Sequence, residues 1–225
     1  MSAPSRIQSW PVIRHVVLIA GALVMLAPFI WMLSTASKPQ TEIFSSDLHL
    51  IPYHFALWDN LRIAFEKANL WRFLLNGLIV TVSIFGLQVL IALPAAYALA
   101  KLRFLGRDVL FALVVFCILI PPQATAIPVF LLLHKLGVLD SYAALVLPFA
   151  ISVFGIFLMR QFFKTVPDDL IDAARMDGIS EFGIVWRVML PTAIPAVTAF
   201  GIFSVVAHWN DYFWPLIVLN SEHLR

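Results

Sequence analysis

The most polar part of this chain is the loop at residues 160–187, and the types and spacing of its side chains predict a helix, a turn and a second helix. Pro167 suits a first helical turn, where its missing N–H is not needed, and Asp168 complements the positive end of the helix dipole. Gly178 stands where a helix C-cap needs a left-handed residue, and Ser180 can cap the helix that follows. The segment therefore predicts a helical hairpin, a shape that can dock into a cleft on a soluble partner.

Small and apolar side chains complete the first predicted helix of this hairpin. Leu170, Ile171 and Ala174 are expected to share one face of it. Ala173 and Ala174 have short side chains, so they allow another surface to approach closely.

A few polar side chains lie inside or at the end of apolar runs, where polar groups are costly and usually functional. Gln123 follows two consecutive prolines, which predict a broken helix with free carbonyls at membrane depth. Gln123 can line the path of a hydroxyl-rich substrate, or its amide can satisfy those carbonyls. Asn210 and Asp211 lie toward the outer half, where an interfacial anchor or a gate that faces the solute fits. Asn76 and Gln88 are typical of hydrogen bonds between helices.

No set of residues predicts catalysis or a metal site in this chain. His49 and His54 share a loop, but no third ligand stands at a spacing typical of metals. No serine, histidine and acid set stands out, and the nine glycines never form a Walker A phosphate loop. A net charge of +2 without a basic stripe does not indicate a nucleic-acid partner. The sequence therefore predicts a chain that is not itself an enzyme.

The composition requires membrane-spanning helices to position these residues. The chain is 61% hydrophobic and 12% charged over 225 residues, and a soluble domain typically carries about 25% charged residues. A soluble globular protein is therefore excluded. A span needs about 20 apolar residues, and in lipid only a helix satisfies its own backbone. Five uncharged runs are long enough, and each predicts a span: residues 16–37, 73–100, 109–133, 141–159 and 188–210.

The expected fold is an all-α, polytopic membrane helical bundle that forms a single transmembrane domain over residues 1–225. Lysine and arginine favour the segments that are cytoplasmic if the N-terminus is inside, most clearly residues 101–108. The 160–190 loop is then cytoplasmic and residues 38–72 are outside. In this outer loop Trp58, Leu61 and Phe65 recur at helical spacing, which predicts an interfacial amphipathic helix. It either caps the bundle or docks a partner.

Residues 172–191 contain a spaced motif: Asp172-Ala-Ala, three residues, Gly178, nine residues, Val188, one residue, Leu190-Pro. It resembles the Glu-Ala-Ala loop motif of permease subunits of binding-protein-dependent ABC importers, with conservative changes at Asp172 and Val188. Four more strings look like the carbohydrate-uptake branch of that family, and in particular like the second permease of maltose and glycerol-3-phosphate importers. They are Ala98–Arg107, Leu139–Pro148, Arg160–Pro167 and Trp209–Pro215.

The resemblance implies a function and a set of partners. In the family this loop forms the coupling helix, which fits a groove of an ATP-hydrolysing subunit. The residues that would carry this coupling are Asp172, Ala173, Ala174, Gly178, Leu190 and Pro191. The chain would hold no cofactor of its own, because two ATPase subunits bind ATP and Mg²⁺. It would pair with a second, non-identical permease in the bacterial cytoplasmic membrane. An extracytoplasmic binding protein would deliver the solute, a sugar or a sugar-like compound such as a disaccharide or glycerol phosphate.

Two other functions are compatible with parts of the sequence. A secondary transporter driven by an ion gradient would need intramembrane acids or inverted repeats, and only Asp211 lies even near a span. A non-transporting assembly subunit could use the loop merely to tether a soluble partner. The resembling permeases typically carry a sixth span, and residues 214–225 read as the connection into it. We therefore expect the 225-residue chain to be a shortened product that lacks this last span.

Overall fold

The computed structural model describes residues 9–44 and 49–221, and within these ranges every regular element is a helix. The chain divides into two compact units, residues 1–71 and residues 72–225. The α-helices are α1 (Ser9–Ala36), α2 (Gln40–Ile43), α3 (Leu57–Glu66), α4 (Leu70–Lys101), α5 (Arg107–Ile118), α6 (Ala126–Lys135), α7 (Tyr142–Val146), α8 (Val153–Phe163), α9 (Asp168–Met176), α10 (Glu181–Ile184), α11 (Leu190–Thr192), α12 (Ile194–Trp209) and α13 (Phe213–Val218). Two 3-10 helices, η1 (Pro122–Thr125) and η2 (Leu147–Phe149), and a π-helical segment, η3 (Val185–Met189), connect them.

The first unit consists of a long apolar helix and a folded loop at its end. Every residue of α1 from Trp10 to Leu33 is exposed, so the loop of this unit leaves that part of the helix uncovered. The loop is fastened to the end of α1, since Ala56 N–H donates to the Ser37 carbonyl at 2.9 Å and the Lys38 ammonium donates to the His49 carbonyl. The amphipathic helix predicted in this loop is present as α3.

Two described helices are long and apolar enough to cross a bilayer alone, residues Trp10–Ala36 and α4. The other three predicted spans are each broken into a bent pair of helices. The bends measure 97° between Arg107–Ile118 and Pro122–Lys135, 42° between Tyr142–Phe149 and Val153–Phe163, and 82° between Glu181–Thr192 and Ile194–Trp209. If each pair counts as one span, the chain has up to five, and each of residues 109–133, 141–159 and 188–210 then contains a bend.

The bends follow from local chemistry at the breaks. The predicted break at two consecutive prolines is confirmed, because Pro121 is extended (φ −67°, ψ 135°) and ends the path of α5. At the second bend Ser152 is extended and its hydroxyl accepts from Gly155 N–H at 3.0 Å, which caps α8 as a new helix. Prolines 191 and 195 flank the third bend, at Ala193, and each lacks the N–H that a continuous helix would use.

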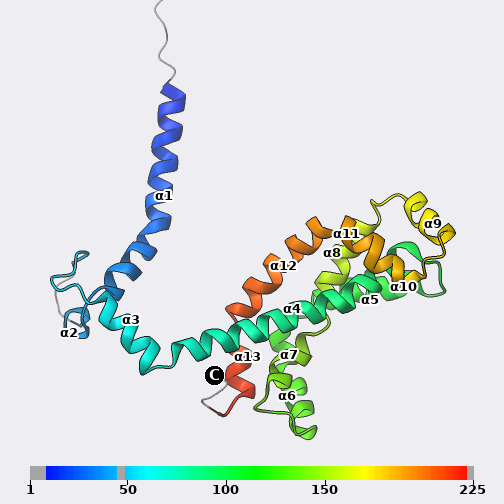
Figure 1. Cartoon of the computed structure of the whole chain (residues 1–225). Coiled ribbons are helices and arrows are strands. Elements are labelled where there is room, and N and C mark those ends of the chain that lie inside the picture. The colour runs from blue at the N-terminus through cyan, green and yellow to red at the C-terminus, as the bar shows by residue number, and fades with distance from the viewer. Residues whose placement is uncertain (1–8, 45–48, 222–225) are drawn as a thin grey trace, which may run out of the picture. The chain divides into compact units, whose positions relative to one another are not determined.

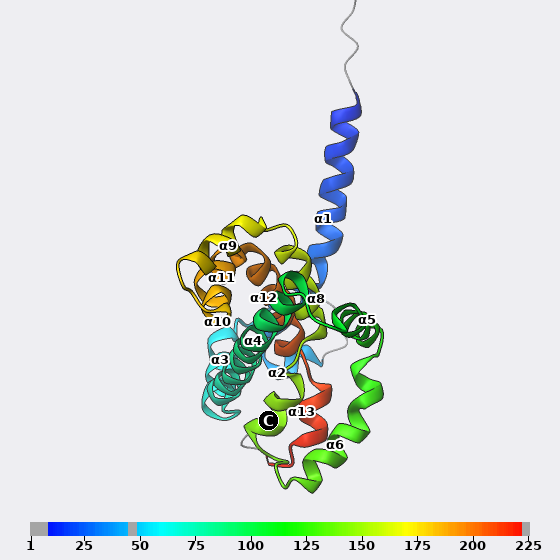
Figure 2. The same ribbon diagram turned by 90° about the vertical axis from the view of Figure 1, so that its right-hand side faces the viewer.

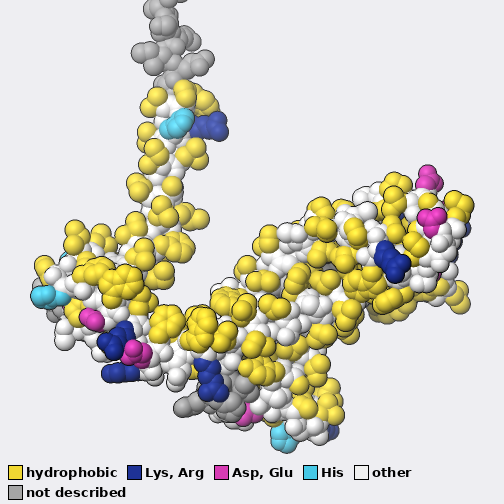
Figure 3. All heavy atoms as spheres, in the orientation of Figure 1, with side chains coloured by type: hydrophobic (Ala, Val, Ile, Leu, Met, Phe, Trp, Pro, Cys, Tyr) yellow, Lys and Arg dark blue, Asp and Glu magenta, His cyan; other side chains and the backbone are white. Residues whose placement is uncertain are grey.

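Helix α4 contributes buried residues to each of the three apolar clusters of the second unit. Leu93, Ala96 and Tyr97 pack with α8, α9 and α12, and Ala92 and Leu99 pack with α8 and α5. Ile84 packs with α6, α7 and α13. Figures 1 and 2 show α4 running through this unit with the shorter helices on either side. The remaining surface is strongly apolar, and Figure 3 shows hydrophobic side chains along the unit with acidic side chains at the end where α9 lies.

Polar side chains join α4 to its neighbours inside the apolar region. Gln88 is 4% exposed; its amide N–H donates to the Phe149 carbonyl at 2.9 Å and its carbonyl accepts from the Ser204 hydroxyl at 2.6 Å. Nearer the other end, the Tyr142 hydroxyl donates to Asn76 Oδ1 at 2.7 Å. The prediction that Asn76 and Gln88 serve hydrogen bonds between helices is therefore confirmed.

Replacing Gln88 by leucine should destabilise the second unit, because it removes the bridge from α4 to α12 and leaves the Ser204 hydroxyl without its acceptor. An interhelical hydrogen bond of this kind contributes about 1 kcal/mol. Thermal unfolding in detergent micelles measures the loss, and a double-mutant cycle with Ser204→Ala isolates the pair.

Thr81 on the same helix provides the matched control for this prediction. Its hydroxyl is buried and has no hydrogen-bond partner among the described residues. Thr81→Val should therefore leave the melting temperature unchanged or raise it. Equal losses in Gln88→Leu and Thr81→Val would show that the Gln88 bridge contributes nothing specific.

Candidate functional site

The polar segment after α8 forms a helical hairpin, as its sequence predicts. We call it the α9–α11 hairpin: α9, the turn at Gly178, and the helical run from Glu181 to Thr192. Pro167 is extended just before α9, and Asp168 stands in its first turn. The Ser180 hydroxyl accepts from Gly183 N–H at 3.2 Å and so caps the second arm.

The turn of the hairpin is a Schellman motif. Gly178 has a φ of +76°, its N–H donates to the Arg175 carbonyl at 3.0 Å, and Ile179 N–H donates to the Ala174 carbonyl at 3.0 Å. These two bonds satisfy carbonyls that the end of α9 would leave free. Because the left-handed conformation costs little only for glycine, Gly178 determines where α9 stops.

One face of α9 is buried and the opposite face is exposed. Ile171 and Ala174 are 2% and 6% exposed and belong to the apolar cluster around Tyr97. Leu170 was expected on this face but is 43% exposed, because Ile171 and Ala174 alone fill the contact with the cluster. Ala173 is exposed, as is the Asp172 side chain.

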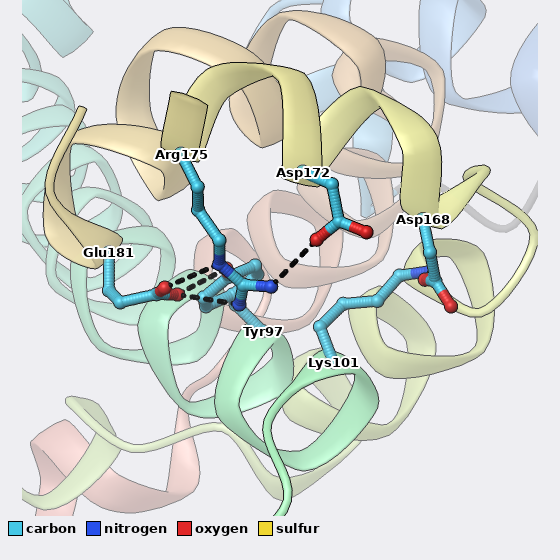
Figure 4. Close-up of polar contacts among 6 residues, drawn as sticks. All are labelled: Tyr97, Lys101, Asp168, Asp172, Arg175 and Glu181. Carbon is cyan, nitrogen blue, oxygen red and sulfur yellow. Dashed lines mark hydrogen bonds and ion pairs between the residues drawn. The ribbon is translucent and has the colours of Figure 1, made fainter. Parts of the chain in front are cut away.

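Polar contacts fasten the hairpin to the end of α4, and Figure 4 shows the six side chains that make them. Glu181, in the second arm, accepts from Arg175 Nε at 2.7 Å and from the Tyr97 hydroxyl of α4 at 2.5 Å. Arg175 Nη1 also donates to Asp172 Oδ1 at 3.0 Å, within α9. Because the same guanidinium binds Glu181, it joins the two arms of the hairpin. Charge-assisted contacts of this kind are roughly twice as strong as neutral ones.

A second contact lies one turn further along α4. The Lys101 ammonium donates to Asp168 Oδ1 at 2.5 Å and to the Val166 carbonyl at 2.6 Å. The Lys101 side chain is 7% exposed, whereas that of Asp168 is 77% exposed. Lys101 is therefore held against the start of α9 from the protein side, and Asp168 covers it on the water side.

The charges of these groups are stabilised by their partners. The hydrogen bond from Lys101, with its positive charge, lowers the pKa of the Asp168 carboxyl from its ordinary value. Asp168 thus favours the folded state above the ordinary carboxyl pKa, and this contribution disappears only as the pH falls through the lowered value. The hydrogen bond to Glu181 raises the pKa of the Arg175 guanidinium, so Arg175 stays charged throughout.

Sequence reasoning missed Tyr97 and Lys101. A signal for them was present, because residues four apart lie on one face of a helix, here the face at the end of a long apolar run. Their partners Glu181 and Asp168 are 84 and 67 residues away, and no local pattern points to those pairs.

The other predicted coupling residues, Leu190 and Pro191, lie in α11 at the far end of the hairpin. Leu190 is half-buried and packs against the cluster around Tyr97, and Pro191 is exposed. They lie near the start of the predicted fifth span, residues 188–210, and the bend of the chain follows at Ala193, two residues after Pro191.

The predicted substrate-path residues do not form one cluster. Gln123 is exposed in η1, at the 97° bend between α5 and α6. Asn210 follows α12 and its amide donates to the Val206 carbonyl at 2.8 Å, and Asp211 accepts from Trp214 N–H at 3.3 Å. The described contacts include none that joins Gln123 to Asn210 or Asp211. Asn210 and Asp211 instead shape the turn from α12 to α13.

Substituting Gly178 by alanine should destabilise the α9–α11 hairpin by about 1 kcal/mol, because a Cβ is unfavourable at this φ. A Cβ here would meet no heavy atom within 4 Å, so the loss would come from the backbone alone. Amide hydrogen exchange of residues 176–181 measures it. Gly178→Asn should lose less, since asparagine tolerates the left-handed region. Unchanged exchange in Gly178→Ala would contradict the role of the turn.

Comparison with known proteins places the chain among transport proteins. Residues 88–224 match the family model described as "Binding-protein-dependent transport system inner membrane component". The polygalacturonan/rhamnogalacturonan transport system permease protein YtcP of Bacillus subtilis is 34% identical over 205 residues, which cover 91% of this chain and 71% of that protein. The sn-glycerol-3-phosphate transport system permease protein UgpE of Yersinia enterocolitica is 31% identical over 216 residues, 93% of this chain and 76% of that protein.

A solved structure supports the same relationship. The crystal structure of a bacterial ABC transporter involved in the import of the acidic polysaccharide alginate contains a chain that superposes with a TM-score of 0.85 at 29% identity, covering all of this chain and 79% of that one. The helical architecture and the spaced motif of residues 172–191 thus agree with the sequence matches. The chain belongs to the inner-membrane permease family of binding-protein-dependent ABC importers.

Proposed function

We propose that this permease carries a sugar or sugar-like solute across the bacterial cytoplasmic membrane and that ATPase subunits drive it through the α9–α11 hairpin. The relatives support the solute class, because their names specify a pectin-type polysaccharide, arabinooligosaccharides and glycerol 3-phosphate, and the structural neighbour imports alginate. All are hydroxyl-rich, carbohydrate-derived compounds. A disaccharide, an oligosaccharide or a glycerol phosphate is therefore the solute class to test.

The observation that carries the coupling proposal is the exposed face of α9. At 3.6 residues per turn, Asp169, Asp172, Ala173 and Met176 lie opposite the buried Ile171 and Ala174. We call these four residues the docking face. It combines two carboxylates with a small and a flexible apolar side chain, and Met176 is 85% exposed. A groove with basic rims and an apolar floor on an ATPase subunit complements this face.

The remaining motif residues serve the shape of the hairpin in this proposal. Ala174 lets α9 lie close to α4, Gly178 sets the turn, and Leu190 and Pro191 carry the second arm to the bend before α12. Docking would then use Asp172 and Ala173 directly. ATP and Mg²⁺ are bound by the two ATPase subunits, and the chain itself contributes no catalytic residue.

The transport cycle follows from these roles. An extracytoplasmic binding protein delivers the solute to the outer mouth formed with a second, non-identical permease. The ATPase subunits close on ATP and displace the docking face, which rearranges the spans so that the solute enters. Hydrolysis resets the inward-facing state. This order places the N-terminus and the hairpin in the cytoplasm. Gln123, Asn210 and Asp211 are the polar groups proposed for the solute path, since each stands at a break in a helix.

Reconstituted vesicles test this function. The chain, its partner permease and the ATPase subunits are assembled with the binding protein, and uptake of radiolabelled galacturonate oligosaccharide, arabinose oligosaccharide and glycerol 3-phosphate is measured. ATP-dependent uptake of one probe that survives ionophores is expected. Uptake that ionophores abolish and ATP does not drive would establish a secondary transporter, and an assembled complex without uptake of any carbohydrate probe would favour a tethering subunit.

Introducing arginine at Ala173 should uncouple ATP hydrolysis from uptake, because a bulky cation on the docking face blocks close approach. A docking defect of about 1.4 kcal/mol corresponds to a roughly tenfold weaker docking of the ATPase subunit, and uptake per ATP hydrolysed should fall with it. Insertion of the spans and pairing with the partner permease should persist, since Ala173 is exposed and does not hold the hairpin together.

Two matched variants make this prediction specific. Ala173→Ser keeps the side chain small and should transport normally. Ala174→Arg places the same cation on the buried face, where it should lower the yield of folded protein rather than uncouple it. Normal uptake by Ala173→Arg would refute docking through this face.

A further inference from the structure

We propose that Tyr97 and Lys101 of α4 are positioning residues that hold the α9–α11 hairpin and α4 as one rigid body. The inference rests on the proposed function in one respect only: the ATPase subunits are taken to be what displaces the hairpin. The contacts themselves are properties of this chain: Tyr97 to Glu181 at 2.5 Å and Lys101 to Asp168 at 2.5 Å. They connect α4 to both arms of the hairpin, and the first of these arms, α9, carries the docking face.

The covalent connections of the hairpin are poorly suited to transmit a displacement. Toward α8, the chain passes through the non-helical residues 164–167. Toward α12, it turns by 82° at Ala193. Each of these is a place where the backbone changes direction, and such places absorb motion as hinges. A displacement of α9 therefore reaches the spans most directly across its side-chain contacts.

The side-chain contacts with α4 are shielded and of two kinds. Tyr97 is 2% exposed, and its ring lies in the apolar cluster with Ile171, Ala174 and Ile184 of the hairpin. Its hydroxyl donates to the Glu181 carboxylate of the second arm, and this carboxylate also binds Arg175 of α9. A single hydroxyl on α4 is therefore linked directly to the second arm and, through Glu181, to α9. Packing resists separation of the surfaces, and the directional polar contacts resist sliding, which packing alone permits.

Helix α4 continues this connection into the membrane. Gln88 joins it to Ser204 of α12 and to the carbonyl of Phe149, just before the 42° bend that leads into α8. Asn76 joins it to Tyr142 at the start of α7. A rigid hairpin and α4 would therefore move α12 together with the break that separates α7 from α8.

Distance measurements by electron paramagnetic resonance test the inference without any solute. Spin labels are placed at Leu170→Cys on α9 and Leu90→Cys on α4, both exposed sites outside the docking face, in a Cys117→Ser background in lipid nanodiscs. The parent should give one narrow distance distribution. Combining Tyr97→Phe with Lys101→Met should broaden it about twofold, because the hairpin gains local freedom. Lys101→Arg alone, with Tyr97 unchanged, keeps a cationic donor at this position and should give the same narrow distribution as the parent.

The control carries the same chemical changes at exposed positions outside both elements, Tyr212→Phe with Lys135→Met, and should leave the distribution unchanged. An unchanged width in the Tyr97 and Lys101 variant would overturn the inference. A shift of the parent distance beyond its width when the ATPase subunits bind a nucleotide analogue would also overturn it, because the hairpin would then slide on α4. If the double variant fails to insert into the membrane, the width of the distance distribution in Tyr97→Phe alone decides the test, since this variant keeps the buried ring and removes only the hydroxyl.

A transport measurement separates this inference from the proposed function. In the reconstituted importer, the double variant should keep its ATPase activity and lose uptake per ATP hydrolysed by about fivefold, because small misplacements reduce coupled steps strongly. A parent complex that shows no ATP-dependent uptake would refute the proposed function and leave the distance result standing. A normal ratio in the variant of a working importer would refute the inference alone.

Discussion

Backbone hydrogen bonding in lipid is the constraint on which the rest of this structure depends. Hydrocarbon offers no water to a free N–H or C=O, so the membrane segments must be helices, and a break requires other partners or a protein surface. Among the described residues of the second unit, only α4 is long and apolar enough to cross a bilayer without a break of more than 40°. The broken helices meet α4 in three apolar clusters. The unbroken helix thus provides the surface on which the interrupted ones can be held.

The kind of polar contact changes with distance from water. Inside the apolar region α4 uses neutral groups, the amides of Gln88 and Asn76, with hydroxyl partners. At its end it uses the ammonium of Lys101 and, through Tyr97, the Arg175–Glu181 ion pair. Desolvation explains the difference, since the free-energy cost of removing a charge from water is smaller where one member of the ion pair faces water. The hairpin can therefore be attached strongly without placing an ion pair in the hydrocarbon.

Local features of the hairpin could be predicted from the sequence because each depends on one or two residues. A proline starts α9, Gly178 ends it and Ser180 starts the next helix. The bends at 149–153 and at Ala193 could not be read from uncharged runs, which report length and not direction. The exposure of Leu170 and the contacts of Tyr97 depend on which surface packs against α9, and that surface comes from residues far away in the chain.

The long separation between Tyr97 and Glu181 also has a consequence for biogenesis. The Schellman turn and the Ser180 cap use neighbouring residues only, so the hairpin can take its shape as soon as it leaves the ribosome. Its attachment to α4 closes a segment of 84 residues that includes α5 to α8. Those helices must be inserted before the hairpin can reach its place. Attachment of the hairpin therefore reports that the preceding insertion was completed correctly, and an unattached hairpin exposes the apolar side chains of Ile171 and Ile184, which are buried once it is in place.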